Sequence, residues 1–284
     1  FPPHSPTDMP TTDHPPLVIE SGRIERHYWA DIWRYRELLG FLAWRDIKVR
    51  YQQTLLGASW AIVQPLASVI IFTFVFGRLA KMPSGPEPYF LVVMAGQLAW
   101  QLFANTLGNT SGSLVGNAHL IAKVYFPRLV VPTSTVAVAL VDFVILLSLY
   151  GIALAWTGVV PTYRVIFLPI FILLTLLLAL GAGLWLASLT VRFRDFRIVV
   201  PFLLQIGVFA TPVGYRTDFL PNWQAVLALN PMTGVIDAYR WCLLSEGAIF
   251  HWESLFATVC WAFILMVSGI WYFRRTERSF ADII

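Results

Sequence analysis

The sequence predicts an all-α integral membrane protein with six transmembrane helices, an amphipathic helix before the first, and re-entrant half-helices between the fifth and sixth. Hydrophobic residues make up 57% of the 284 residues and charged residues 13%, and the mean hydropathy is +0.67. Six segments are apolar enough and long enough to cross a bilayer. The clearest, residues 55–77, contains no Asp, Glu, Lys or Arg and forms a helix ~35 Å long against a hydrocarbon core ~30 Å thick.

The residues before the first span divide into two parts. Residues 1–22 are rich in proline and lack the cationic start and apolar core of a signal peptide, so we expect a disordered leader there. Residues 23–56 carry an apolar repeat at three- and four-residue intervals: Tyr28, Ile32, Tyr35, Leu39 and Leu42. This repeat predicts an amphipathic helix in the cytoplasmic interface, either a simple membrane anchor or, as we favour, a gating or partner-facing element.

Residues 57–284 are expected to form the transmembrane domain. The spans are placed at 59–77, 89–111, 129–156, 165–189, 198–212 and 254–273. With both termini in the cytoplasm, 15 of the 20 Lys and Arg residues lie on the inner side. The positive-inside rule favours this orientation.

Two segments between the spans do not look like ordinary loops. Residues 117–128, NAHLIAKVYFPR, predict a short cytoplasmic helix stopped by proline, either a plain connection or a knob that another protein pushes. The fifth span is short and proline-containing, and residues 216–253 after it are too apolar for an exposed loop. Within them Asn230 and Pro231 predict the start of a helix too short to cross, so we expect re-entrant half-helices near the outer leaflet.

The sequence offers no visible active site. It has no glycine-rich loop ending in Gly-Lys-Ser or Gly-Lys-Thr, and none of the zinc-protease, serine-hydrolase or paired-aspartate patterns. We therefore expect no catalytic, cofactor-binding or metal-binding residue, and the dispersed basic residues argue against nucleic acid as a partner. Asp142 is the one acidic residue inside a span and should face protein or water. We favour a structural hydrogen bond there over a proton relay.

Aromatic residues of the first and fifth spans could line a conduit. Their faces would let a sugar chain pass by stacking without holding any one unit tightly. An interfacial belt, lipid contact or bundle packing is the alternative for each of them. The candidate lining residues are Trp60, Phe72, Phe76, Phe202 and Phe209.

Four motifs in order resemble the permease subunit of ABC-type polysaccharide exporters, the family of O-antigen, capsule and teichoic-acid exporters within the type-2 ABC exporter superfamily. They are RDIKVRYQQTLLGASWAIVQPL at 45–66, LIAKVYFPR at 120–128, VRFRDFR at 191–197 and LNPMTGVIDAYR at 229–240. The resemblance implies a homodimer in the bacterial cytoplasmic membrane. It also implies two separate ATP-binding cassette subunits that bind ATP and magnesium, and a polyprenyl-diphosphate-linked polysaccharide as cargo. An ABC-2 type exporter of drugs or small lipids is the alternative.

The resemblance also implies roles for particular segments. Residues 31–54 would be the gate helix, 194–197 a cytoplasmic turn near lipid headgroups, and 218–244 the re-entrant pair that closes the outer mouth. The coupling helix, seated in a groove of the ATPase, would include Asn117, His119, Leu120, Ile121, Lys123 and Tyr125. The outer gate would include Asn230, Pro231, Tyr239 and Arg240. The gate cations Arg45, Lys48 and Arg50 are expected to hold the phosphates of the lipid carrier, unless they serve only orientation and contact with anionic membrane lipids.

Overall fold

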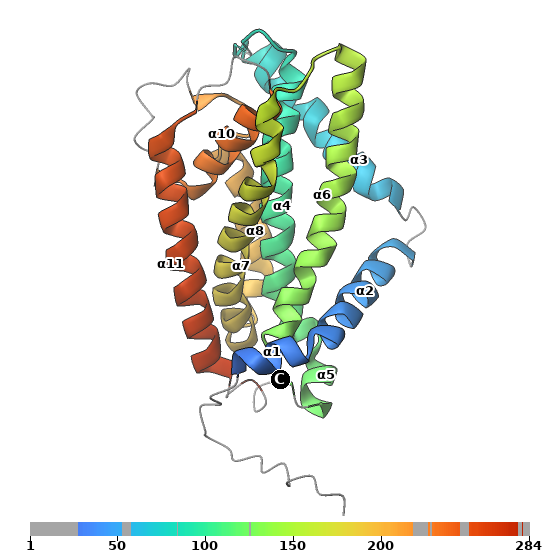
Figure 1. The fold of residues 1–284 in the computed structure, drawn as a ribbon, viewed down its shortest axis with the longest axis vertical. Helices are drawn as coiled ribbons and strands as arrows, with labels where there is room; N and C mark the ends of the chain where they lie inside the picture. The colour runs from blue at the N-terminus through green and yellow to red at the C-terminus, as the bar shows by residue number, and fades with distance from the viewer. Residues whose placement is uncertain are drawn as a thin grey trace, which may run out of the picture.

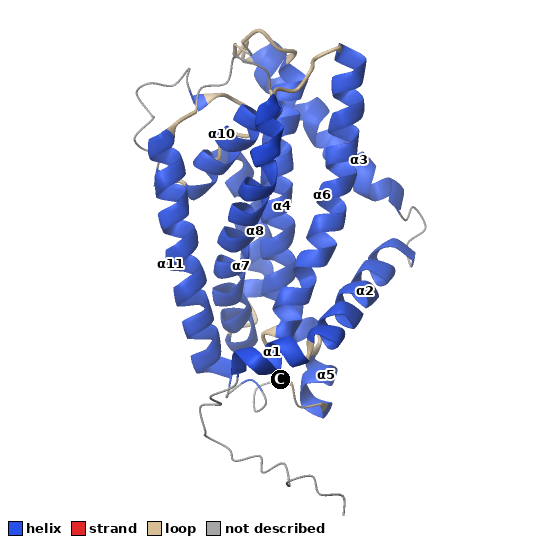
Figure 2. Ribbon diagram, in the orientation of Figure 1, coloured by secondary structure: helices blue, strands red, loops and turns tan. Residues whose placement is uncertain are grey.

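The computed structural model describes residues 28–52, 58–83, 85–124, 126–217, 227, 229–244, 250–277 and 280. Within these ranges the protein is built from helices and loops without any strand (Figure 2), so the all-helical fold class is confirmed. The expected leader lies outside the described residues, as do the first residues of the expected re-entrant pair.

In the part of the chain that the structure describes, five helices are long and apolar enough to cross a membrane. The first begins as α3, Ala58–Phe72, and continues as a π-helix, η1, Thr73–Leu79. The others are α4, Tyr89–Gly116; α6, Val130–Thr157; α7, Leu168–Arg192, preceded by the 3-10 turn η2, Tyr163–Phe167; and α11, Trp252–Thr276.

The predicted fifth span is shorter than a bilayer. Its helix, α8, Phe196–Ala210, has 15 residues and is therefore ~22 Å long. The helix ends two residues before the predicted boundary, and the chain from Thr211 to Tyr215 is not helical. Pro212 explains this end, because its ring clashes with the preceding helical turn and it has no N–H to donate. The number of complete crossings is thus five by helix length, with α8 as a shorter sixth element.

Helix α4 occupies the centre of the bundle, between α6 and α7 (Figure 1). It has the lowest mean hydropathy of the five spans, 1.3. Yet 72% of the residues in its 18-residue apolar stretch are buried, against 17–33% in the corresponding stretches of the other spans. Its polar side chains, including Gln97, Thr106 and Thr110, are buried within the protein and do not face lipid. The least hydrophobic span is therefore the one most shielded from the membrane.

The contact between α7 and α11 depends on two glycines. A Cβ atom on Gly269 would lie 2.4 Å from the carbonyl oxygen of Gly181, and one on Gly181 would lie 2.6 Å from the backbone nitrogen of Met266. Nearby, Trp185 stacks on Tyr272 with ring centroids 4.1 Å apart. Close backbone approach of this kind drives helix association in a bilayer, where apolar burial gives little driving force.

The remaining helices lie at the two ends of the bundle. Helices α1, Tyr28–Arg34, and α5, Ala118–Lys123, lie at the end of the bundle where α11 finishes (Figure 1), which we call the α5 end. Helix α2, Arg36–Gln52, rises obliquely from there along α6. Helix α10, Pro231–Leu243, lies at the opposite end, the α10 end.

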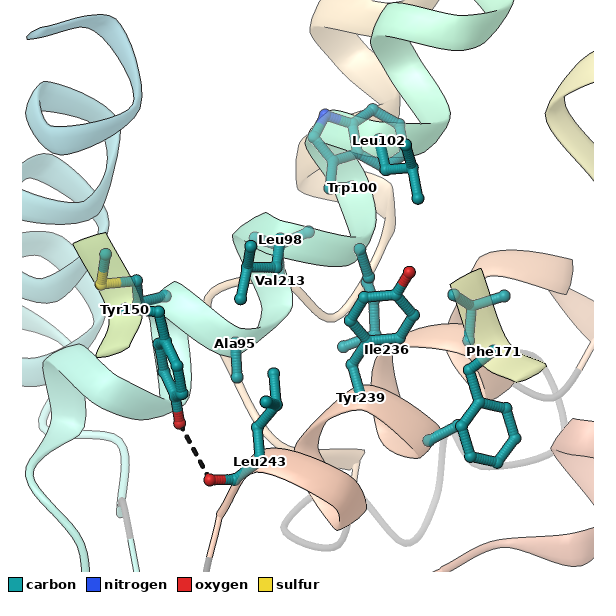
Figure 3. Close-up of a cluster of buried hydrophobic side chains, with 14 of the residues drawn as sticks. Ala95, Leu98, Trp100, Leu102, Tyr150, Phe171, Val213, Ile236, Tyr239 and Leu243 are labelled. Atoms are coloured by element: carbon teal, nitrogen blue, oxygen red, sulfur yellow. Dashed lines mark hydrogen bonds between the residues drawn. The ribbon is translucent and has the colours of Figure 1, made fainter. Parts of the chain in front are cut away.

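Helix α10 is enclosed by the transmembrane helices. It has 13 residues, ~20 Å, too few to cross a bilayer, and almost all of them are buried. Figure 3 shows its side chains among those of α4, α6 and α7, with the Tyr150 hydroxyl donating to the Leu243 carbonyl oxygen at 3.1 Å. The ring of Tyr239 meets Phe143 edge-on, with centroids 6.2 Å apart. The expected short helix is therefore present, and its re-entrant position in the membrane stays a prediction.

Candidate functional site

Helix α5 forms a short knob at the end of the bundle (Figure 1), which confirms the predicted short helix. Asn117 makes the corner from α4: its backbone N–H and its side-chain amide both donate to the Ser113 carbonyl oxygen, at 3.1 and 2.9 Å. His119 and Lys123 are exposed, Leu120 is half-buried and Ile121 is buried. Tyr125 lies outside the described residues. One side of α5 is therefore anchored and the other is open to a partner.

The anchored side of α5 belongs to an apolar cluster that also holds α1 and α2. Ile121 is grouped with Leu42, Phe126 and Phe273, all nearly or fully buried. The apolar repeat predicted for the amphipathic helix faces this cluster: Tyr28 and Leu42 are buried, and Ile32, Tyr35 and Leu39 pack against it. The apolar repeat therefore packs against the bundle, while Phe41 and Trp44 of α2 are exposed. The position of this segment in the cytoplasmic interface stays a prediction.

Polar contacts fasten α2 to the bundle at two places. Near its middle, the Arg45 guanidinium donates to the Asn117 side-chain oxygen at 2.6 Å and pairs with Asp46. At its end, Arg50 pairs with Asp142 of α6, with 2.7 Å between Nη2 and Oδ2. Tyr51 donates to the other oxygen of Asp142 at 2.5 Å. Helix α2 therefore connects the corner of α5 to the middle of a transmembrane helix.

The Asp142 carboxylate joins three helices, α2, α4 and α6. Besides the two groups from α2, its carboxylate accepts a hydrogen bond from the Asn105 amide of α4 at 3.1 Å. Its side chain is only 10% exposed, so the preferred expectation of a hydrogen bond within the bundle is confirmed. Burial and the bond to Asp142 raise the pKa of the Tyr51 phenol, which keeps it a donor at neutral pH.

The gate cations differ in their surroundings. Arg45 and Arg50 have the internal partners just described, whereas Lys48 is exposed. A lipid phosphate would therefore have to compete with Asn117 and Asp142 for the two arginines. Their role in holding a phosphate remains a prediction.

A second polar cluster joins three distant segments on Glu277, just after α11. One carboxylate oxygen accepts the Arg128 backbone N–H at 2.8 Å and the other accepts the Tyr28 hydroxyl at 3.0 Å. The Arg128 guanidinium donates to the Glu277 carbonyl oxygen, and Arg274 lies over the Tyr28 ring at 4.4 Å. Burial raises the pKa of the Glu277 carboxyl. No spacing in the sequence signals this cluster, because Tyr28 and Glu277 are 249 residues apart.

The structure brings three of the five candidate conduit aromatics together. Phe72 stacks on Phe76 and on Phe209 with centroids 5.6 Å apart in each case, which joins α3 and η1 to α8. Trp60 and Phe202 are 56% and 58% exposed, and no ring contact within the described ranges ties them to this group. Phe209 is also 61% exposed, whereas Phe72 is buried. A lining role for these rings remains a prediction.

At the α10 end, Arg240 supports the non-helical segment that follows α8. Its buried guanidinium donates to the carbonyl oxygens of Val213 and Tyr215 at 2.9 and 2.8 Å, and to that of Val92 on α4 at 3.3 Å. Carbonyl groups at membrane depth need such partners because lipid supplies none. Arg240 thus allows irregular backbone where a helix would otherwise be required.

Helix α10 starts where the sequence predicted. The Asn230 side-chain oxygen accepts the Met232 N–H at 3.0 Å, and Pro231 is the first helical residue. The Asn230 amide reaches the Thr211 hydroxyl at 3.4 Å, so the cap also touches the end of α8.

Comparison with known proteins places this arrangement in a family. Residues 37–244 match the ABC-2 type transporter family over most of the chain, from α2 to α10. The chain belongs to the ABC-2 type transporter family. This ABC-2 type chain is 30% identical to the O-antigen export system permease protein RfbA of Myxococcus xanthus over 257 residues, which are 89% of this chain and 98% of the relative.

Two further relatives agree with this membership. The O-antigen export system permease protein RfbA of Klebsiella pneumoniae is 26% identical, covering 87% of this chain and 95% of its own length. The polysialic acid transport protein KpsM of Escherichia coli is 26% identical, covering 83% and 92%. The likeness therefore extends over nearly the whole of each relative.

Proposed function

We propose that this chain is the transmembrane subunit of an ATP-driven exporter of a polyprenyl-diphosphate-linked polysaccharide, such as an O-antigen or a teichoic acid, in the bacterial cytoplasmic membrane. The observation that carries the proposal is the match to O-antigen and polysialic acid permeases over 83–89% of this chain. The chain is a transport subunit, and ATP with its magnesium would be bound by a partner, because the sequence has no nucleotide-binding loop.

The α5 end is the proposed contact with two ATP-binding cassette subunits in the cytoplasm. Exposed His119 and Lys123 lie on a short helix whose other side is fixed to the bundle. Through Asn117 and Arg45, a push on α5 would reach α2, and through Arg50 it would reach Asp142. These contacts support a mechanical path from α5 to Asp142, and its test is whether ATP hydrolysis by the partner stays coupled to export.

The proposed unit of export is a homodimer. The α3 span is only 17% buried, and α8 exposes most of its side chains, so these two elements carry apolar faces that the chain itself does not cover. A two-fold axis would bring the same faces of two copies together. The aromatic residues of α3 and α8 would then border a passage between the copies.

The export function is tested by removing the chain from its host and restoring it on a plasmid. Lipid-linked glycan is then measured separately in the inner and outer leaflets. Depletion should leave polymer in the inner leaflet, and the restored chain should clear it. Normal glycan distribution, together with lost tolerance to a small amphiphile, would replace this proposal with export of drugs or small lipids.

The coupling role of α5 is tested with two matched charge reversals. Lys123→Glu changes the exposed side of α5, and Arg78→Glu changes an exposed residue in the last turn of η1, at the opposite end of the first span. Lys123→Glu should reduce recovery of the ATP-binding subunit with the purified chain at least tenfold, whereas Arg78→Glu should not. Equal recovery of the ATP-binding subunit with both variants would show that α5 does not form the contact.

A further inference from the structure

The corner between α7 and α8 carries three exposed arginines within six residues. Arg192 ends α7, Arg194 lies in the turn and Arg197 lies in the first turn of α8. In the part of the chain that the structure describes, none of them forms an ion pair with a carboxylate, including the exposed Asp195 between them. The arginines of α2 differ, because Arg45 and Arg50 already have partners on other helices.

The corner is tight enough for its arginines to act on one ligand. The Arg197 N–H donates to the Arg194 carbonyl oxygen at 3.2 Å, a four-residue turn that brings the two Cα atoms within roughly 7 Å. The Phe193 N–H closes the end of α7 by donating to the Leu189 carbonyl oxygen at 2.7 Å. Guanidinium groups match phosphate oxygens in pairs of parallel hydrogen bonds, so two neighbouring arginines suit a diphosphate.

An exposed apolar stripe begins one residue beyond Arg197. It follows α8 at helical spacing and consists of residues that are 50–77% exposed: Ile198, Phe202, Ile206 and Phe209. At the rise of an α-helix, the stripe is ~17 Å long. Other residues of α8, among them Val200, Leu204 and Gly207, border an apolar hollow of about 260 Å³ together with α4, α7 and the start of α10, and no stripe residue lines this hollow. A cationic corner continuous with an apolar face fits a lipid that has an anionic head.

We propose that the α7–α8 corner binds the diphosphate of the lipid-linked glycan, with the prenyl chain along the exposed stripe of α8. This assignment rests on the proposed function, which supplies the substrate class. Anionic phospholipid offers the same phosphate chemistry but only one charged phosphate in its common form. Two neighbouring exposed arginines, Arg194 and Arg197, favour the diphosphate because it carries more charge and more acceptor oxygens.

The test measures binding directly and does not depend on transport. The full chain, with its ATP-binding subunits, is placed in phosphatidylcholine nanodiscs and titrated with a radiolabelled C55 polyprenyl diphosphate. Arg194→Gln with Arg197→Gln should weaken binding at least tenfold. The matched control, Arg78→Gln with Lys81→Gln, removes two exposed charges at and just after the end of η1 and should change the affinity less than twofold.

A second variant should tighten binding, which misfolding cannot imitate. Asp195→Asn removes the one acidic side chain of the corner while keeping a residue that caps helices well. We expect about threefold tighter binding of the probe, in line with removal of one nearby like charge in a solvated site. Unchanged or weaker binding by this variant would overturn the assignment.

Two other outcomes would also overturn it. One is an unchanged affinity in the Gln variant. The other is a competition result: an equal mole fraction of phosphatidylglycerol displaces the probe from the wild-type chain, and the Gln variant loses both lipids equally. The corner would then be a general anionic-lipid site. Failure of the export function itself is recognised separately, by normal glycan distribution in the depleted host.

Discussion

Replacing Asp142 with Asn tests how α2 is held. Asparagine keeps one acceptor for Tyr51 or Asn105 but cannot pair with Arg50. The Asp142 side chain is 10% exposed and that of Arg50 is 41% exposed. The loss should therefore lie between an exposed ion pair, at most about 1 kcal/mol, and a broken buried one, about 3–5 kcal/mol. We take about 2 kcal/mol, which corresponds to a roughly 30-fold larger opening equilibrium of α2.

Hydrogen exchange measured by mass spectrometry in nanodiscs reads out this opening. Amides in the second half of α2 should exchange about 30-fold faster in Asp142→Asn, because their protection reflects the local opening free energy. Ser148→Ala is the control, since the exposed Ser148 hydroxyl lies on the same helix and, among the described residues, bonds to the Val144 carbonyl oxygen of its own turn alone. Exchange within twofold of wild type would show that Asp142 does not hold α2. A uniform increase over α7 as well would indicate general destabilisation instead.

Three further predictions concern the stability of the bundle. Gly269→Val should lower the thermal unfolding midpoint by several degrees or abolish folding, because its Cβ would lie 2.4 Å from the Gly181 carbonyl oxygen. Gly151→Val, on the open side of α6, should do neither. Fluorescence-detected size exclusion after heating distinguishes the two variants. Arg240→Met removes the guanidinium donor from the Val213 and Tyr215 carbonyl oxygens, at about 1–3 kcal/mol each, and should reduce the heat-resistant fraction more than Arg240→Lys. Equal losses would contradict the carbonyl-capping role. Burial raises the pKa of the Glu277 carboxyl above its usual 4.5, so the folded state binds that proton more tightly than the unfolded state does. The stability gained from the bound proton is full below pH 4.5 and is lost as pH rises through the raised pKa. Unfolding midpoints measured across pH should show this decline in the wild type and a flatter curve in Glu277→Gln.

Much of the fold was predictable because the bilayer limits the choices. Five spans, the short helix after Asn117 and the start of α10 at Asn230 all follow from hydropathy, capping and proline placement. The end of α8 was less predictable, because an apolar pattern continues through Pro212 although the helix does not. Local signals decide where helices form, and they do so only approximately at the ends.

The candidate site was harder to predict because its contacts join distant segments. The sequence required that Asp142 have a partner, but it did not indicate Tyr51, which is 91 residues away. Likewise, Arg50 and Arg194 look alike in a charge pattern, since both belong to the positive side of the chain. Only the packing of α2 on α6 distinguishes an arginine that is already paired from one that is open to a ligand.

The order of burial among the helices indicates which elements would move in an export cycle. Helices α4, α7 and α11 are joined by close backbone contacts and buried polar groups, whereas the α3 span is 17% buried and follows α2 in the chain. Helix α2 is fixed to α5 through Asn117 and to α6 through Asp142. If an ATP-binding partner displaces α5, the strain reaches α2 first and the loosely held first span next. The rigid helices would then act as a frame, and α3 and α8, which carry the exposed apolar and aromatic faces, would form the movable wall.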